Sequence, residues 1–420
     1  MPYCSMLPAE ELTRAAAQNH VSWFSDNALV AGGSVQSEGV ATVIYSPAWS
    51  PDVQGEVFLA FPEGDSVGSV IEDALALARE IRVRQVSCWS LLPTWPSTLA
   101  VSLLAQGFSW GWQPHWMALE LATAPEAPPT PPGITLALDT GEPCAVTGLP
   151  YYDPAEAPRL QAHFQMQPQR TFHFGAWEEG KLVGHSLLHV SADRPEYAGI
   201  YNVGVIPEAR KRGIGRAVSW AACQWAREQG CRYVLLNAAT HIYARLGFVS
   251  LGYGQTWWLF PPVLEAPPAP AQVALVEALG RGDLSALASL GAFALDAPLP
   301  CKMTPLEVAV RLQQPEAVSW LLAAGATPEL IPLWDLGWKE QVGALVRARP
   351  ALVNQRLLEW SKTPLHEAVW RDDSELVRLL LSAGPDLELR DTQFNGTPLD
   401  WAKHLGRTAL VELIEKAIPK

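Results

Sequence analysis

Apolar and polar residues follow the same order twice in the first two-thirds of this chain. Residues 66–81 carry apolar side chains at helical spacing, and the apolar run 85–89, which has the length of a strand, follows them. Residues 213–230 and 233–237 repeat this order. Each series continues with a short helical segment and then an aromatic strand. The pattern predicts two α/β units with mixed sheets.

The two series also match residue by residue over short stretches. Ala78-Arg79-Glu80 aligns with Ala226-Arg227-Glu228, and Gly107-Phe108 aligns with Gly247-Phe248. A tandem duplication accounts for both matches. Two unrelated α/β units with similar helix composition remain the alternative, because short matches are weak.

Two proline-rich stretches, 123–133 and 261–271, divide the chain. Such a composition favours extended, semi-rigid linkers. We therefore expect three domains, at 1–122, 134–260 and 270–418.

The last block repeats on a shorter scale. Thr-Pro-Leu occurs at Thr304, Thr363 and Thr397, and a degenerate unit at 333–353 lacks this start. Thr suits a helix N-cap, Pro the first turn, and Gly the end of the second helix. These features resemble the ankyrin repeat, which implies an all-α solenoid that stacks helix pairs and binds proteins. The resemblance implies that His366 makes internal hydrogen bonds of its repeat.

A candidate phosphate site lies at 199–216. An apolar, β-prone run ends at Pro207, and Arg210-x-x-Gly213-x-Gly215 follows it before a helix. Glycines at a helix N-terminus let backbone N–H groups approach an anion, which the helix dipole also favours. Arginine and lysine side chains beside them add opposite charge.

This stretch resembles the coenzyme A-binding segment of GNAT acetyltransferases. The resemblance implies that the strand before the loop is splayed and that its main chain pairs with the pantetheine arm, and that the loop holds the pyrophosphate. The implied residues are Val203, Gly204 and Val205 for the arm, and Arg210, Lys211, Arg212, Gly213, Ile214, Gly215 and Arg216 for the pyrophosphate.

A second match to the same family lies further on. Asn237 follows a strand, and Tyr243-x-x-Leu-Gly-Phe comes after it at a spacing a few residues shorter than the family's. The resemblance implies acetyl-coenzyme A as cosubstrate, an amine as acceptor, Asn237 in the cofactor site, and Tyr243 as general acid to the leaving thiolate. Tyr243 could instead be a packing residue.

Other candidates carry less weight. His173, His185 and His189 alternate along apparent strands, where a histidine is usually structural, so the general base stays unassigned. In the first α/β unit, the phosphate loop aligns with 62–67, where Glu63 and Asp65 replace the basic residues. Carboxylates repel a pyrophosphate, so we expect one coenzyme A site per chain, with the first unit structural.

Composition narrows the function further. The net charge of −13 argues against a nucleic-acid partner, and no apolar run is long enough to cross a membrane. The first residues do not predict a signal peptide, and the six scattered cysteines fit free thiols in a cytoplasmic protein without a metal site. We expect an N-acetyltransferase with a protein-binding ankyrin module. The alternative is a catalytically silent acyl-coenzyme A sensor whose ankyrin array is the working part.

Overall fold

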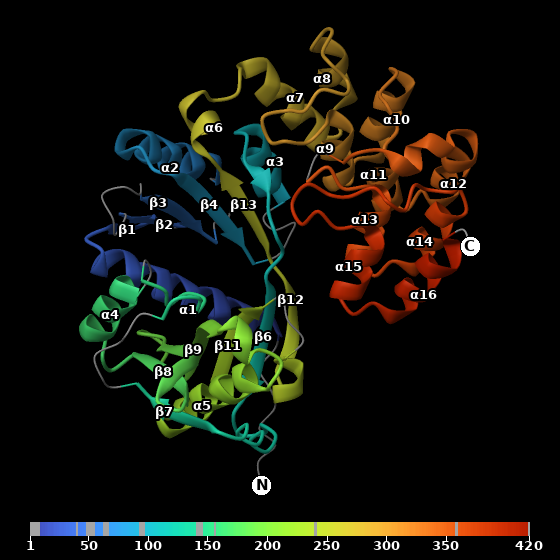
Figure 1. Cartoon of the computed structure of the whole chain (residues 1–420). Coiled ribbons are helices and arrows are strands. Elements are labelled where there is room, and N and C mark those ends of the chain that lie inside the picture. The colour runs from blue at the N-terminus through green and yellow to red at the C-terminus, as the bar shows by residue number, and fades with distance from the viewer. Residues whose placement is uncertain are drawn as a thin grey trace. The chain divides into compact units, whose positions relative to one another are not determined.

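The structure is a computed structural model of the 420-residue chain. It describes residues 9–38, 41–47, 55–61, 67–91, 97–139, 146–154, 157–238, 242–357 and 360–418. The chain divides into two compact units, one built mainly from residues up to Ala266 and the other mainly from Pro267 onward. The first holds two β-sheets with helices, and the second is helical (Figure 1). The expected order of an α/β region followed by an all-α region is therefore confirmed.

The first sheet is mixed and has six strands. β3 and β4 are parallel, whereas the pairs β1–β2, β2–β3 and β4–β13 are antiparallel. Across the sheet the order is β1 (Ser34–Glu38), β2 (Ala41–Ser46), β3 (Glu56–Ala60), β4 (Gln85–Ser90), β13 (Gln255–Leu259) and β5 (Ser109–Trp110). The helices α2 (Val67–Ile81) and α3 (Ser97–Ala105) connect strands of this sheet.

The second sheet is also mixed and has seven strands. Only β10 and β11 are parallel. Across the sheet the order is β12 (Val249–Tyr253), β6 (His115–Glu120), β11 (Tyr233–Ala238), β10 (Tyr197–Val205), β9 (Lys181–Val190), β8 (Thr171–Glu178) and β7 (Ile134–Leu138).

The two sheets exchange one strand each. β6 lies before the 123–133 stretch in the sequence, but it pairs with β11 and β12 of the second sheet. β13 is the last strand of the second series, but it pairs with β4 of the first sheet. In both sheets the exchanged strand lies between the strand after the long helix and a short edge strand. The shared order supports duplication of one unit.

Helices cover both faces of the second sheet. α5 (Ile214–Glu228) buries Val218, Ala222 and Ala226 against one face, in a core that includes Phe174 and Leu188. α4 (Ala157–Met166) and α1 (Ala9–Val30) cover the other face. α1 packs against strands of both sheets (Figure 1).

The helical unit contains five successive helix pairs, each packed on its neighbours. The pairs are α7 (Pro270–Arg281) with α8 (Leu284–Ser289), α9 (Pro305–Arg311) with α10 (Pro315–Ala323), α11 (Leu330–Asp335) with α12 (Lys339–Ala348), α13 (Pro364–Trp370) with α14 (Ser374–Leu381), and α15 (Pro398–His404) with α16 (Thr408–Ala417). A 3-10 turn, η3 (Pro350–Asn354), precedes α13.

The Thr-Pro-Leu starts behave as predicted. Thr304, Thr363 and Thr397 are each an N-cap in a reciprocal capping box, and Pro occupies the first turn of each helix. His366 Nδ1 lies 2.8 Å from Thr363 Oγ1, and its Nε2 lies 3.0 Å from the carbonyl oxygen of Gly396. The predicted internal role of His366 is confirmed.

One linker prediction is wrong. Residues 261–271 were expected to be extended, but Pro261–Glu265 form a short helix, α6, and α7 begins at Pro270. Proline is compatible with the first turn of a helix, where its missing N–H is not needed. The helix is held because Leu264 is buried and its carbonyl accepts a hydrogen bond of 3.0 Å from Arg79 Nε.

The described cysteines Cys88, Cys223, Cys231 and Cys301 are free and buried, whereas Cys4 and Cys144 lie outside the described residues. None of the helices in the described ranges combines the length and the apolar character needed to cross a membrane.

Candidate active site

Strands β10 and β11 separate at one end. They pair at Tyr197–Tyr233, Ala198–Val234 and Gly199–Leu235, and the pairing then stops although β10 continues to Val205 and β11 to Ala238. On its other side β10 stays paired with β9, with a register shift between Tyr201 and Gly204. The main chain of 200–205 is therefore unpaired toward β11. Val203, Gly204 and Val205 lie on this segment.

The Gly-x-Gly segment forms a turn that leads into α5. A 3-10 turn, η1 (Pro207–Ala209), follows β10, and Gly213 is the N-cap of α5 with φ of +88°. The first helical hydrogen bond runs from the N–H of Ala217 to Gly213, and no side chain among the described residues caps the helix. The N–H groups of Ile214, Gly215 and Arg216 thus precede the first helical bond, as an anion site requires.

The basic residues of this turn differ in their contacts. Arg210 Nε donates to the carbonyl oxygen of Val205 at 3.1 Å, which ties the turn to the end of β10. Arg212 makes a two-pronged ion pair with Glu178, at 2.9 and 2.5 Å. The hydrogen bond from Arg212 lowers the pKa of the Glu178 carboxyl. Lys211 is exposed and Arg216 is half-buried.

Ile214 is placed differently from its neighbours. Its side chain is buried in the core beneath the sheet, so only its main chain can face a ligand.

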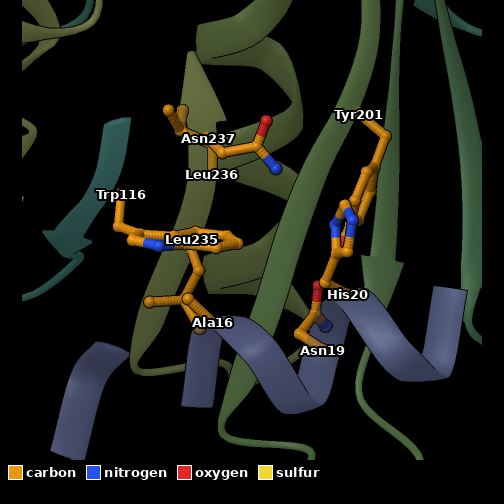
Figure 2. Close-up of a pocket in the computed structure, with 8 residues that line it drawn as sticks. All are labelled: Ala16, Asn19, His20, Trp116, Tyr201, Leu235, Leu236 and Asn237. Atoms are coloured by element: carbon orange, nitrogen blue, oxygen red, sulfur yellow. The ribbon is translucent and has the colours of Figure 1, made fainter. Parts of the chain in front are cut away.

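Asn237 lies on β11 beside a small recess at the strand separation (Figure 2). The recess is also lined by Tyr201 of β10, Trp116 of β6, and Asn19 and His20 of α1. Its volume of about 10 Å³ leaves room for about one water molecule. The recess therefore has no space for a substrate without movement of its walls.

Tyr243 lies just after residues 239–241, which are outside the described ranges. It precedes a 3-10 turn, η2 (Ala244–Leu246). Its ring is buried and packs edge-on against Phe248. Burial raises the pKa of Tyr243 to about 12, although a hydrogen bond with Ser219 of α5 opposes the shift. The phenol is therefore protonated at neutral pH, as a general acid must be.

His20 was not among the sequence-predicted residues. It is buried among the rings of Phe24, Trp89 and Tyr201, and its Nε2 has no hydrogen-bond partner among the described residues. Burial lowers the pKa of His20 to about 3, so the ring is neutral. It comes from α1, far from the motif in sequence, and no local pattern marks it.

A second missed feature is a buried hydrogen-bond chain beside Gly204. Asp139 Oδ2 lies 2.9 Å from His173 Nδ1, His173 Nε2 lies 3.1 Å from His185 Nδ1, and His185 Nε2 lies 2.7 Å from the carbonyl oxygen of Pro150. We call these three side chains the Asp139 relay. A Cβ added at Gly204 would be 3.0 Å from His185 Nε2. The end of the relay is thus in contact with the unpaired segment of β10.

A third buried group contains Asp26, His163 and His189, whose candidate ligand atoms all lie within 4.8 Å of one another. Their spacing along the chain does not indicate a metal site, because these residues come from three separate segments. Arg170 Nη2 lies 2.6 Å from Asp26 Oδ2, and its charge helps to lower the pKa values of both histidines, after burial as the main cause. A cation bound by these three side chains would be repelled by the positive charge of the Arg170 guanidinium.

In the first sheet, the parallel strands β3 and β4 take the place that β10 and β11 have in the second sheet. β3 and β4 pair along five consecutive residues, from Glu56–Gln85 to Ala60–Trp89, and the N–H of Phe61 extends the ladder to the carbonyl of Trp89. The counterpart of the separation between β10 and β11 is therefore closed. Residues 62–66 of the predicted acidic loop lie outside the described residues, and Val67 begins α2.

Comparison with known proteins identifies two regions. Residues 145–248 match the GNAT acetyltransferase family, and residues 361–392 match the ankyrin repeat. Among curated proteins, the mycothiol acetyltransferase of Rhodococcus erythropolis is 42% identical over 84 residues, and that of Paenarthrobacter aurescens is 35% identical over 80 residues. These matches cover 18% and 17% of this chain, and the chain spans only 28% and 25% of the two relatives.

Two solved structures are also similar. A GCN5-related N-acetyltransferase from Kribbella flavida has a TM-score of 0.43 at 18% identity, over 60% of this chain and 98% of that one. A tandem GNAT protein from the clavulanic acid biosynthesis pathway has a TM-score of 0.42 at 17% identity, over 60% and 97%. The family-model matches show that residues 145–248 are a GNAT acetyltransferase domain, in a chain that continues into a helical region with an ankyrin repeat.

Proposed function

We propose that this protein transfers an acetyl group from acetyl-coenzyme A to an amine. The observation that carries the proposal is the separation of β10 from β11 next to the uncapped N-terminus of α5. The separated strands leave main-chain groups free to pair with the pantetheine amides. The N-terminus of α5 leaves N–H groups for the pyrophosphate. Both features occur in the part of the chain that matches the acetyltransferase family.

In this proposal the arm lies along Val203, Gly204 and Val205, and Asn237 faces it from β11. Main-chain N–H groups from Lys211 to Arg216 receive the phosphates, and Arg210, Lys211, Arg212 and Arg216 supply positive charge. Tyr243 protonates the departing thiolate. Positioning of amine and thioester supplies most of the rate, and strand N–H groups polarise the carbonyl.

The domain proposal follows from the same site. Residues 134–260 carry the acetyl-coenzyme A site, and residues 1–122 form a second GNAT-like half without one. The closed pairing of β3 with β4 supports a single site per chain. The free thiols of the described cysteines fit a cytoplasmic protein.

The acceptor is proposed only as an amine. The similar curated proteins are mycothiol acetyltransferases, but the matches span less than a third of those proteins. Acceptor pockets depend on loops that differ between members of one fold. The relatives therefore support the acetyl donor more than the acceptor.

We propose that residues 270–418 bind a protein partner through the stacked repeats. A hollow of about 450 Å³ among α10, α11 and α12 is lined in part by Leu322, Leu333 and Trp338. Solenoids of this kind use their extended surfaces for partners.

Calorimetric titration with acetyl-coenzyme A tests the donor site, with an expected stoichiometry of one. Release of coenzyme A in the presence of a pooled panel of primary amines tests the transfer. Binding without release by any amine would favour the silent sensor. Two equivalent sites would contradict the single-site assignment.

A further inference from the structure

The Asp139 relay has a proton count that follows from its donors and acceptors. A carbonyl oxygen only accepts, so His185 Nε2 carries the hydrogen that bonds to Pro150. His185 Nδ1 is then a lone pair and accepts from His173 Nε2. His173 Nδ1 faces the Asp139 carboxylate, and this contact requires one more hydrogen between them. The resting relay therefore holds one proton beyond two neutral imidazoles and an ionised carboxylate.

The same atoms support a second arrangement with one proton fewer. Asp139 then accepts from His173 Nδ1–H, and His173 Nε2 accepts from His185 Nδ1–H. His185 Nε2 is left as a lone pair, which repels the carbonyl oxygen of Pro150 and suits an incoming N–H instead. In this second arrangement, the relay can take up one proton at His185 Nε2.

Its position links it to the proposed acetyl site. His185 pairs with Gly204 across β9 and β10, and its Nε2 lies against the unpaired segment. Tyr151, the neighbour of Pro150, is exposed, has φ of +63°, and is close enough to Tyr243 to contribute to its raised pKa. The segment at Pro150 and Tyr151 thus lies near both the relay and the proposed acid.

We propose that His185 is the general base for the acceptor amine, with His173 and Asp139 as positioning residues that receive the charge. This proposal rests on the proposed acetyl transfer. An amine N–H takes the place of the Pro150 carbonyl at His185 Nε2.

The transfer step balances without another reactant. The amine nitrogen bonds to the acetyl carbon, and the carbon–sulfur bond breaks. The amine proton passes to His185 Nε2 while the Nδ1 proton of His185 passes to His173 Nε2, which restores the resting count. The relay enters this step one proton short, because it releases one to solvent when the amine takes the place of the Pro150 carbonyl. Tyr243 protonates the thiolate and recovers a proton from solvent.

His20 is a weaker base than the relay on this geometry. Its Nε2 has no hydrogen-bond partner among the described residues, whereas His185 Nδ1 lies 3.1 Å from His173 Nε2. Burial lowers the pKa values of both His20 and His185 to about 3. His185 can pass a proton from its Nδ1 to the neutral His173 imidazole, whose resulting charge the Asp139 carboxylate then balances.

The test compares full-length variants with acetyl-coenzyme A and a pooled panel of primary amines. His185→Gln keeps an N–H donor for Pro150 but cannot accept and relay a proton. We expect its turnover to fall by about 10²-fold or more, with the affinity for acetyl-coenzyme A within about twofold of the unmodified chain. Asp139→Asn should reduce kcat without raising KM for the amine. His404→Gln, an exposed residue of α15, is the matched control.

A second measurement reads the proton count directly. In the full chain with ¹⁵N-labelled histidine, His185 should be protonated at Nε2 and bare at Nδ1, and Asp139→Asn should shift this signature. Full turnover of His185→Gln, or His185 protonated at Nδ1 in the resting protein, would overturn the proposal. An unmodified chain that binds acetyl-coenzyme A but acetylates no amine contradicts the proposed function, and the base assignment falls with it.

Discussion

Two glycines at the start of α5 differ in what the protein itself requires of them. Gly213 has φ of +88°, a backbone conformation that side chains strain, so any substitution there disturbs the turn directly. Gly215 has no such requirement, because a Cβ would meet only Val205 Cγ2 at 3.6 Å, an ordinary contact. The missing side chain at Gly215 therefore leaves space that the fold does not use.

We predict that Gly215→Val weakens acetyl-coenzyme A binding by about tenfold or more, which corresponds to about 1.4 kcal/mol. The added methyl groups would occupy the path of the phosphates to the N–H groups of α5. Thermal unfolding should change little. Gln224→Val, on the exposed side of the same helix, is the control. Unchanged affinity in calorimetry would remove the phosphate site from this turn.

Tyr243→Phe should lower turnover by about 10²-fold and leave acetyl-coenzyme A affinity nearly unchanged, because a general acid acts in the transition state. The lost hydrogen bond to Ser219 should cost only about 1 kcal/mol of stability. Ser219→Ala removes the same hydrogen bond and keeps the phenol. If both variants are fully active in steady-state assays, Tyr243 is a packing residue.

Buried histidines make stability depend on pH. Burial lowers the pKa values of His20, His185 and His189 to about 3, below the ordinary 6.5. A lowered pKa in the folded state gives stability that is present above pH 6.5 and is lost as pH falls toward 3. At pH 5 the loss is on the order of 2 kcal/mol for each.

We therefore predict that the thermal unfolding temperature of the sheet unit falls steadily from pH 7 to pH 5. His20→Phe, which suits the surrounding rings, should reduce this acid sensitivity. A midpoint independent of pH over this range would show that these histidines do not stay neutral on folding.

At the scale of residues, the sequence predicts features that are formed by residues close together in the chain. Gly213, Gly215 and their basic neighbours act within one turn, so their order along the chain is enough to place them. The relay joins His173 of β8 and His185 of β9 with Asp139, which follows the end of β7. The alternation of side chains along a strand indicates which face of its strand each histidine lies on. It does not say which strands are neighbours in the sheet.

At the scale of elements, the exchange of β6 and β13 joins the two halves. The sequence predicts these strands correctly but not their partners, because two copies of one pattern fit either sheet equally well. β6 contributes Trp116, Met117, Ala118 and Leu119 to buried positions of the second sheet. A large buried apolar side chain is worth about 1.5–3 kcal/mol, and a domain's total stability is about 5–15 kcal/mol.

We predict that residues 134–260 alone do not fold, because removal of β6 bares one edge of β11 and opens the core. Circular dichroism and amide exchange should show an unfolded or aggregated chain. Adding residues 109–122 to the fragment through a flexible linker should partly restore structure. A stable, acetyl-coenzyme A-binding 134–260 fragment would contradict a structural need for the exchange.

At the scale of the whole molecule, the sheet unit and the helical unit each have their own core. A chain that ends at Ala266 keeps α6 and its bond to Arg79. We expect it to fold, to bind acetyl-coenzyme A with a stoichiometry of one, and to keep its turnover on a small amine. Residues 267–420 should fold separately by stacking five helix pairs. Loss of binding in the shorter chain would make the repeats part of the transferase.

The exchanged strands also bear on how such a chain can change by descent. A copy that no longer holds a cofactor is ordinarily expendable, and deletions soon remove it. Here the first half contains β6, which pairs with β11 and β12 of the second sheet. We therefore expect the first half to be retained because it supplies this strand, while the sequences of its own loops are free to change.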